Sequence, residues 1–417
     1  MRRKGIPAIA LASLTLLAVL LPGIALAQLA TPKWRYAAQG SVVGLCVLSG
    51  GDSVIVLDSQ GFLYIIGEEG TTKGLLRFSH LSYDSTGHEV FSCAQGEKVF
   101  LIAEAGYGAE AYYLYNDEGK RLWTVYIPGK TVSYSLSPNG EYLAVASRQA
   151  RPGGETGRIV VSVYKDGKKA YSVVARLASA AQEAQVKVAV SDRGQLALYD
   201  PRGEQLALYS EDGELVKSYS VGGPVSRVYI SPDGTLVSYC TPSPQGCDLN
   251  TVSLVSGLNW SVKAVYGLLA IAPDYSRVAV YGGNGTIDIY TIQGSRVLEI
   301  KALQPTGVAL AGGDGRYILV VEKYNVRLLD SQGDEVVEGV IYSGATAYSI
   351  DPQGKGFAVA DDLGRIYFYV NPQEERLGLI LRVLLLGIIL VSTILALLYQ
   401  AGRRPSQPPE EAEEIYP

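Results

Sequence analysis

Four cysteines are the residues of this chain whose spacing most clearly predicts a chemical bond. Cys240 and Cys247 flank the segment Thr-Pro-Ser-Pro-Gln-Gly, which a disulfide can close into a short loop. Cys46 and Cys93 fall at corresponding positions of two neighbouring repeats. A bond between them is one interpretation, and the alternative is two buried free thiols that act as small apolar side chains. Disulfides would place this chain in an oxidising compartment.

Residues suited to catalysis or metal binding are sparse. The two histidines, His80 and His88, match no common zinc spacing. The sequence contains no Gly-x-Ser-x-Gly nucleophile turn, no Cys-x-x-Cys pair and no Asp-x-Asp-x-Asp-Gly calcium loop. We therefore expect no catalytic residue, no metal and no cofactor. Asn259 and Asn284 each begin an Asn-x-Ser/Thr sequon and are predicted glycosylation sites in a host that uses them.

The overall charge argues against one class of partner. The chain has 417 residues, of which 18% are charged, and its formal net charge is −5. Nucleic-acid-binding proteins usually carry a basic patch or stripe that contacts phosphates. A mildly acidic chain without such a stripe is not expected to bind nucleic acid.

Both ends of the chain are apolar, and together they predict its topology. Residues 1–27 combine a basic start, an apolar stretch and an Ala-Leu-Ala cleavage motif, which indicates a secretory signal peptide. Residues 377–399 are almost wholly apolar. As a helix with a rise of about 1.5 Å per residue they span roughly 35 Å, enough to cross a bilayer. Arg403 and Arg404 follow, and the positive-inside rule then predicts a cytoplasmic C-terminus.

These segments divide the chain into five predicted parts. They are a signal peptide (1–27), an extracytoplasmic domain (28–371), a stalk (372–376), a transmembrane helix (377–399) and an acidic cytoplasmic tail (400–417). If the first apolar segment instead remains as an uncleaved membrane span, its basic start lies inside and the large domain still lies outside. Both interpretations predict a protein of the cell membrane whose large domain faces away from the cytoplasm.

The large domain repeats one pattern of strands and turns. A hydrophobic strand ends in a turn of the Ser/Asp-Pro-Asp-Gly type, two further strands follow, and a fourth strand often carries an aromatic residue. The clearest turns are Ser137–Gly140, Ser191–Gly194, Ser231–Gly234, Ala272–Tyr275 and Asp351–Gly354. A period of about 40–48 residues with strand-like alternation predicts a β-propeller.

The number of repeats and the position of the first strand predict how the ring closes. We count eight first strands and eight third strands, and the chain opens on an outer strand near residues 33–38. That strand would complete the last blade, which protects the sheet edges. Trp34, Trp123 and Trp260 share one repeat position and are expected to dock between blades. The predicted fold is therefore all-β, an eight-bladed propeller, with seven blades as the alternative because later repeats lack the aromatic residue.

Two segments carry a resemblance to known propeller families. Glu118-Gly119-Lys120-Arg121-Leu122-Trp123 and Gly257-Leu258-Asn259-Trp260 resemble the Gly-x-x-x-Trp docking motif of quinoprotein-like (PQQ-repeat) propellers. The resemblance covers about residues 33–371 and extends more distantly to the WD40 family, although the Trp-Asp dipeptide of that family is absent. Most alanine and aspartate positions of the quinoprotein repeat are also missing. The resemblance therefore implies the fold and does not imply a cofactor.

The repeat topology predicts which face of the propeller would bind a partner. Insertions at 105–110, 148–157 and 241–250 lie between second and third strands, and 176–184 lies between a fourth strand and the next first strand. These connections share one face, and insertions confined to one face usually mark the binding face. The candidate partner-binding residues there are Tyr107, Glu110, Arg148, Arg151, Glu155, Arg176 and Glu183. The chain leaves its last blade at the opposite face through a short stalk, so the elaborated face is expected to point away from the bilayer.

The sequence thus favours a non-enzymatic, membrane-anchored surface propeller that binds a protein or glycan partner. An accessory or assembly subunit of a membrane complex would fit this description. The first alternative is a propeller enzyme, such as a quinone-cofactor dehydrogenase or a hydrolase, because propellers host enzymes through loop variation. A second alternative is a receptor that signals through its helix and acidic tail.

Overall fold

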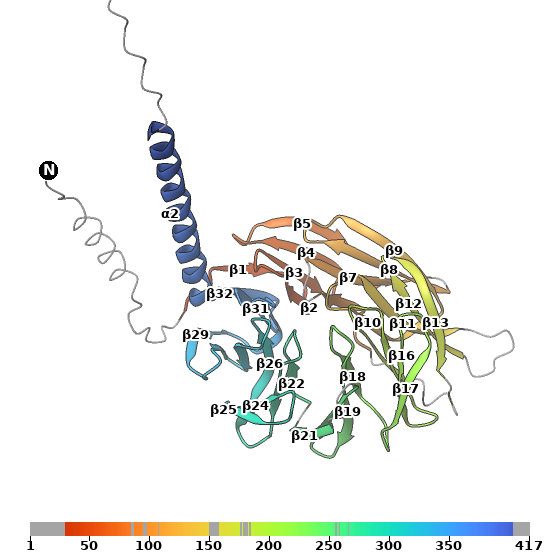
Figure 1. Cartoon of the computed structure of the whole chain (residues 1–417). Helices are drawn as coiled ribbons and strands as arrows, with labels where there is room; N and C mark the ends of the chain where they lie inside the picture. Colours follow the sequence, from red (N-terminus) through yellow and green to blue (C-terminus); the bar gives the residue numbers. More distant parts are fainter. Residues whose placement is uncertain are drawn as a thin grey trace, which may run out of the picture. The chain divides into compact units, whose positions relative to one another are not determined.

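The computed structural model describes residues 30–402 except 85–86, 95–97, 107, 150–157, 176, 178–181, 183–184, 255–256, 258 and 266. The described strands form eight four-stranded antiparallel sheets, the blades of a propeller (Figure 1). Blades 1 to 4 are β2 (Val42–Val47), β3 (Ser53–Asp58), β4 (Phe62–Gly67) and β5 (Thr72–Arg77); β6 (Phe91–Cys93), β7 (Val99–Ala105), β8 (Ala109–Asn116) and β9 (Arg121–Pro128); β10 (Lys130–Leu136), β11 (Tyr142–Gln149), β12 (Arg158–Lys165) and β13 (Lys168–Ala175); β14 (Lys187–Val190), β15 (Leu196–Asp200), β16 (Gln205–Tyr209) and β17 (Leu215–Ser220). Blades 5 to 8 are β18 (Arg227–Ile230), β19 (Leu236–Ser243), β20 (Gly246–Ser253) and β21 (Asn259–Val265); β22 (Leu269–Ile271), β23 (Arg277–Tyr281), β24 (Thr286–Thr291) and β25 (Arg296–Lys301); β26 (Pro305–Ala311), β27 (Tyr317–Glu322), β28 (Asn325–Leu329) and β29 (Glu335–Val340); β30 (Ala345–Ile350), β31 (Gly356–Asp361), β32 (Arg365–Val370) and β1 (Trp34–Ala37).

The N-terminal strand closes the ring, as the sequence predicted. β1 pairs antiparallel with β32, with Trp34 opposite Phe368, and so supplies the fourth strand of the last blade. The Trp34 and Phe368 rings stack with their centroids 5.0 Å apart. The inner strands β2 and β30 are also in contact, which joins blade 8 to blade 1. Eight blades are therefore confirmed, and the seven-bladed alternative is excluded.

The core lies between neighbouring blades rather than inside a single one. All residues of β3 and of β31 are buried, because a second strand is covered by blades on both of its faces. Val54 of blade 1, for example, belongs to the same apolar cluster as Ala358 and Phe368 of blade 8. This arrangement explains why the second strands read as continuous apolar runs, whereas an outer strand such as β17 is mostly exposed.

The tryptophans dock on glycines of the adjacent blade. A methyl group added at Gly167 would lie 2.8 Å from Trp123 Cβ, and one added at Gly294 would lie 3.1 Å from Trp260 Cβ. Trp34 faces Gly70 in the same way. Each of these glycines has a positive φ, between 74° and 86°, and closes the turn from a third to a fourth strand. A side chain at any of them would both strain the turn and displace the indole.

Three other blades carry an aromatic residue in or just after the fourth strand, namely Phe78, Tyr171 and Tyr219, and two of these residues lie outside this motif. Tyr171 does dock, because a methyl group added at Gly213 would lie 2.6 Å from its ring. In blades 1 and 4, however, the strand register places Gly74 and Lys217 at the docking position. Phe78 and Tyr219 come later in the chain and therefore occupy different places.

The C-terminal helix α2 (Pro372–Gly402) forms a unit separate from the propeller (Figure 1). Its most apolar window has a mean hydropathy of 2.7 and is not buried in the protein, so the helix is apolar and long enough to span a membrane. Residues 372–376, which the sequence analysis assigned to an extended stalk, are its first turn and measure only about 8 Å along the axis. The predicted signal peptide (1–27) and the tail beyond residue 402 lie outside the described residues.

Candidate binding face

Strand order assigns every connection to one of two faces of the ring. Because the strands within a blade run antiparallel, connections from second to third strands emerge on the same face as those from a fourth strand to the next blade. We call this the hairpin face. The connections from first to second and from third to fourth strands emerge on the other side, which we call the turn face. The chain leaves β32, a third strand, at the turn face.

Three blades extend their hairpins beyond the others on the hairpin face. The second and third strands of blades 2, 3 and 5 contain seven or eight residues, whereas those of the remaining blades contain five or six. Two extra residues carry a strand about 7 Å further. The segments 105–110 and 241–250, expected to be loops, are largely strand: Ala105 pairs with Glu110, and Ser243 pairs with Gly246. At these two segments the predicted elaboration consists of strands, whereas most of the insertions predicted at 148–157 and 176–184 lies outside the described residues.

Both predicted disulfides are present. Cys46 of β2 is bonded to Cys93 of β6, with their Cα atoms 6.3 Å apart, and joins the inner strands of blades 1 and 2. Cys240 and Cys247 are bonded across the β19–β20 ribbon, with their Cα atoms 5.5 Å apart. The free-thiol alternative for Cys46 and Cys93 is therefore wrong. The second bond fixes the base of an extended hairpin on the candidate face.

Of the seven predicted partner-binding residues, the structure describes two. Arg148 is exposed near the end of β11. Glu110 is buried, with 6% of its surface exposed, and its carboxylate accepts a hydrogen bond from Thr131 of the neighbouring blade. The residue therefore lies between two blades and braces them, and its contact with a partner stays a prediction. The other five lie outside the described residues: Tyr107, Arg151, Glu155, Arg176 and Glu183.

The short connections of blades 6 to 8 carry a feature that the sequence analysis missed. Four large apolar side chains sit at their tips on the hairpin face, and we call them the apolar tips: Leu303, 83% exposed, Tyr324, 54%, Tyr342, 64%, and Leu363, 66%. Hydrogen bonds link the connections to one another, from Ile341 N to Tyr324 O (3.0 Å) and from Asp362 N to Gly344 O (3.0 Å). Clustered exposed apolar groups are typical of interaction surfaces. A single apolar residue inside a turn gives no periodic signal in a sequence.

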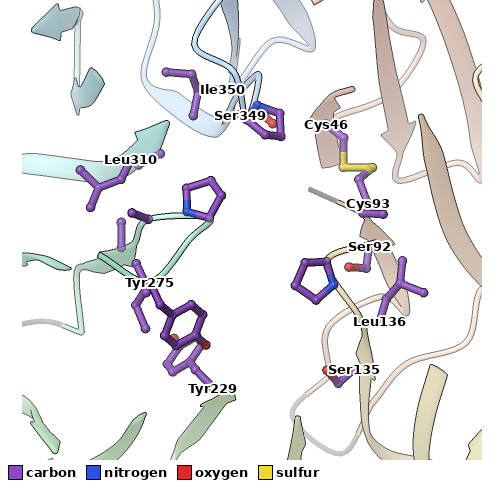
Figure 2. A pocket seen from close by; sticks show the side chains of 18 of the residues that line it. Cys46, Ser92, Cys93, Ser135, Leu136, Tyr229, Tyr275, Leu310, Ser349 and Ile350 are labelled. Carbon is purple, nitrogen blue, oxygen red and sulfur yellow. A yellow bond between two sulfur atoms is a disulfide. The ribbon is translucent and has the colours of Figure 1, made fainter. Parts of the chain in front are cut away.

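A cavity of about 460 Å³ occupies the central channel (Figure 2). The inner strands of all eight blades line it, and none of its lining residues is charged. The lining residues that carry hydroxyl groups are Ser92, Ser135, Ser349, Tyr229, Tyr275 and Tyr348. A quinone cofactor of the PQQ kind carries carboxylates, which need cationic or several N–H partners when buried. This neutral lining does not fit such a group.

Two further predictions concern polar sites elsewhere in the chain. Asn259 and Asn284 are both exposed, and the Asn284 side chain accepts hydrogen bonds from Thr286 within its turn. Glycosylation of either residue stays a prediction. Among the described residues, no group of three or more His, Cys, Asp or Glu side chains is arranged to hold a metal ion.

Comparison with known proteins places this chain by fold. No family model and no curated protein matches the sequence. The structure is similar to that of BamB from Moraxella catarrhalis, with a TM-score of 0.50 and 12% identity over 82% of this chain and 99% of that chain. It is also similar to the Dos1 propeller, with a TM-score of 0.56 and 12% identity over 82% of this chain and 94% of that chain. At such identity the likeness shows the fold alone, and the chain is a β-propeller.

Proposed function

We propose that this protein is a non-enzymatic, membrane-anchored propeller that binds a protein partner through its hairpin face. The observation that carries the proposal is the one-sided elaboration of the ring. Blades 2, 3 and 5 extend their hairpins on that face, whereas the hairpins of the other blades are shorter. Loops and hairpins placed on a rigid scaffold are where such folds bind.

The apolar tips favour a protein over a glycan as the partner. Glycans offer mainly hydroxyl groups, whereas a protein can bury Leu303 and Leu363 together with the two tyrosine rings. The backbone hydrogen bonds between the connections that carry Tyr324, Tyr342 and Leu363 fix this part of the surface before binding, which lowers the entropic cost of association. A membrane complex with this propeller as an accessory or assembly subunit would supply such a surface.

We further propose that the hairpin face lies away from the membrane and outside the cytoplasm. The covalent path supports this orientation, because β32 ends at Val370 on the turn face and the apolar helix begins at Pro372. The predicted signal peptide, the two disulfides and the arginines after the helix support an extracytoplasmic propeller with a cytoplasmic tail.

Partner capture from native membranes tests this proposal. In one variant, Asn-Gly replaces residues 149–158, which shortens the blade 3 hairpin to a two-residue turn between the paired residues Arg148 and Ile159. In a second variant, each apolar tip is changed to serine. A tag on the C-terminal tail then recovers crosslinked partners from cells. We expect the wild-type protein to recover a partner in fixed ratio and both variants to lose at least nine-tenths of it.

The matched control changes exposed apolar residues that lie off the hairpin face. Leu75, Val216 and Val297 belong to fourth strands and are 53%, 60% and 51% exposed. Replacing all three with serine removes exposed apolar area away from the hairpin face and should leave partner recovery unchanged. Undiminished capture by folded hairpin-face variants, or equal loss in the control, would contradict the proposal.

A further inference from the structure

The central channel contains one backbone outlier, at Tyr275. In the corresponding turn of five other blades the fourth residue is a glycine with a positive φ, from 69° to 81°: Gly51, Gly140, Gly194, Gly234 and Gly354. In blade 6 that place is taken by Tyr275, with a φ of 64°. A bulky residue in the left-handed region costs about 1–2 kcal/mol relative to glycine. A glycine at position 275 would relieve this backbone strain, so the presence of tyrosine there points to a role for its side chain.

The side chain of Tyr275 is directed into the cavity (Figure 2). It is more than nine-tenths buried, and no hydrogen-bond partner of its hydroxyl occurs among the described residues. Tyr229, on the inner strand of blade 5, lines the cavity beside it. Burial raises the pKa of Tyr275 well above its usual value, so its phenol keeps its proton and donates at neutral pH. A phenol that lines a cavity and has no partner among the described residues can donate its hydrogen bond to a bound acceptor.

The rest of the lining restricts what that acceptor can be. The Ser135 and Ser349 hydroxyls already accept hydrogen bonds from Val190 N (3.2 Å) and Val47 N (2.9 Å), which brace neighbouring blades. Apolar side chains such as Leu310 and Ile350 form much of the remaining wall. Lys187 and Arg227 begin two inner strands but do not line the cavity. A buried anion would therefore have no charged partner in the lining itself, whereas a neutral molecule has a smaller desolvation cost on entry.

We propose that the channel is a binding site for a small neutral organic molecule with an aromatic or apolar body and a carbonyl acceptor. The phenols of Tyr275 and Tyr229 donate hydrogen bonds to its oxygen. The apolar wall covers its body, and a cavity of about 460 Å³ is within the range of small-molecule sites. This site is independent of the hairpin face.

A matched pair of probes tests the site with the full chain in detergent micelles. N-acetyl-tryptophanamide is neutral, and N-acetyl-tryptophan has nearly the same size but carries a carboxylate. Binding is followed by saturation-transfer NMR and by calorimetry. We expect saturable one-to-one binding of the amide and at least tenfold weaker binding of the acid, because no lining residue can pair with its charge.

Three variants distinguish the loss of the Tyr275 hydroxyl group from a general loss of the fold. Tyr275→Phe keeps the ring and should weaken the amide about fivefold, the loss of one hydrogen bond of about 1 kcal/mol. Ser92→Phe fills the channel and should abolish binding. Tyr126→Phe alters an exposed tyrosine of β9 and should change nothing. The proposal is overturned if the amide does not saturate by 10 mM, if the acid binds equally well, or if Tyr275→Phe, folded by circular dichroism, binds as the wild type does.

Discussion

Replacing Trp34 with alanine should open the propeller rather than loosen one strand. Trp34 is 8% exposed, stacks on Phe368 of blade 8 and packs against Gly70 of blade 1, so it bridges the two ends of the ring. Truncating a buried aromatic residue costs about 3–5 kcal/mol. Trp123 and Trp260 dock in the same way but are only half-buried. Their truncation should cost roughly half as much, about 2 kcal/mol.

Urea unfolding of the full chain in detergent micelles, followed by far-ultraviolet circular dichroism, gives the three differences in free energy of unfolding. Hydrogen exchange provides a second measurement. The amides of Lys33 and Ala38 donate to Phe368 O (2.8 Å) and Gly364 O (2.9 Å), which ties β1 to blade 8. If the ring opens, exchange in β32 and β2 should accelerate together with exchange in β1. A loss below about 1 kcal/mol for Trp34→Ala, or faster exchange in β1 alone, would refute the closing role of this residue.

Three further predictions concern turns, disulfides and pH. An alanine in the left-handed region costs about 1–2 kcal/mol, and Gly167→Ala should lower the free energy of unfolding by more than this because its methyl group also meets Trp123. Gly108→Ala is the control in the same urea assay, since Gly108 has a φ of 79° and open space around it, so that only the backbone cost is measured. A disulfide that closes a longer loop stabilises the fold more, so serine replacement of Cys46 and Cys93, 47 residues apart, should cost about 4 kcal/mol, and that of Cys240 and Cys247, seven apart, about 2.5 kcal/mol. Thermal melts should show the larger fall in melting temperature for the Cys46 and Cys93 variant. Burial raises the pKa of Asp351, so the contribution of this residue to the free energy of unfolding increases as pH falls through its folded-state pKa. Asp351→Asn should remove this increase when the free energy of unfolding is measured between about pH 7 and pH 4.

The ring was predictable from the sequence because each blade repeats the same local pattern. Turn residues such as Ser231–Gly234 mark the end of most first strands, and the surplus strand at the N-terminus could only pair with the last blade. The segment 241–250, which contains two prolines, was expected to be an insertion rather than part of two strands. Pro242 is tolerated there because β18 pairs with β19 only as far as Cys240, so beyond that residue one edge of β19 makes no ladder bonds within its blade.

The candidate sites were less predictable, because they depend on which side of a strand faces a neighbouring blade. Glu110 looked like a loop residue, but its pairing with Ala105 directs the carboxylate toward Thr131. The apolar tips come from four separate connections that only the ring brings together. Tyr275 did carry a signal, since Ala272–Tyr275 ends in tyrosine where the other turns end in glycine. That signal gains its meaning from the φ angle and the cavity beside it.

The two proposed sites can be tested independently because the ring supports both without either depending on the other. The extended hairpins project from second and third strands, whereas the channel is lined by the first strands and by the turns that follow them. Shortening the blade 3 hairpin should therefore remove partner capture and leave N-acetyl-tryptophanamide binding intact, and Tyr275→Phe should do the reverse. Coupling between the two would require the inner strands to move, which the Cys46–Cys93 bond between two of them opposes. A variant that lost both activities while keeping its fold would show that the channel and the hairpin face act as one site.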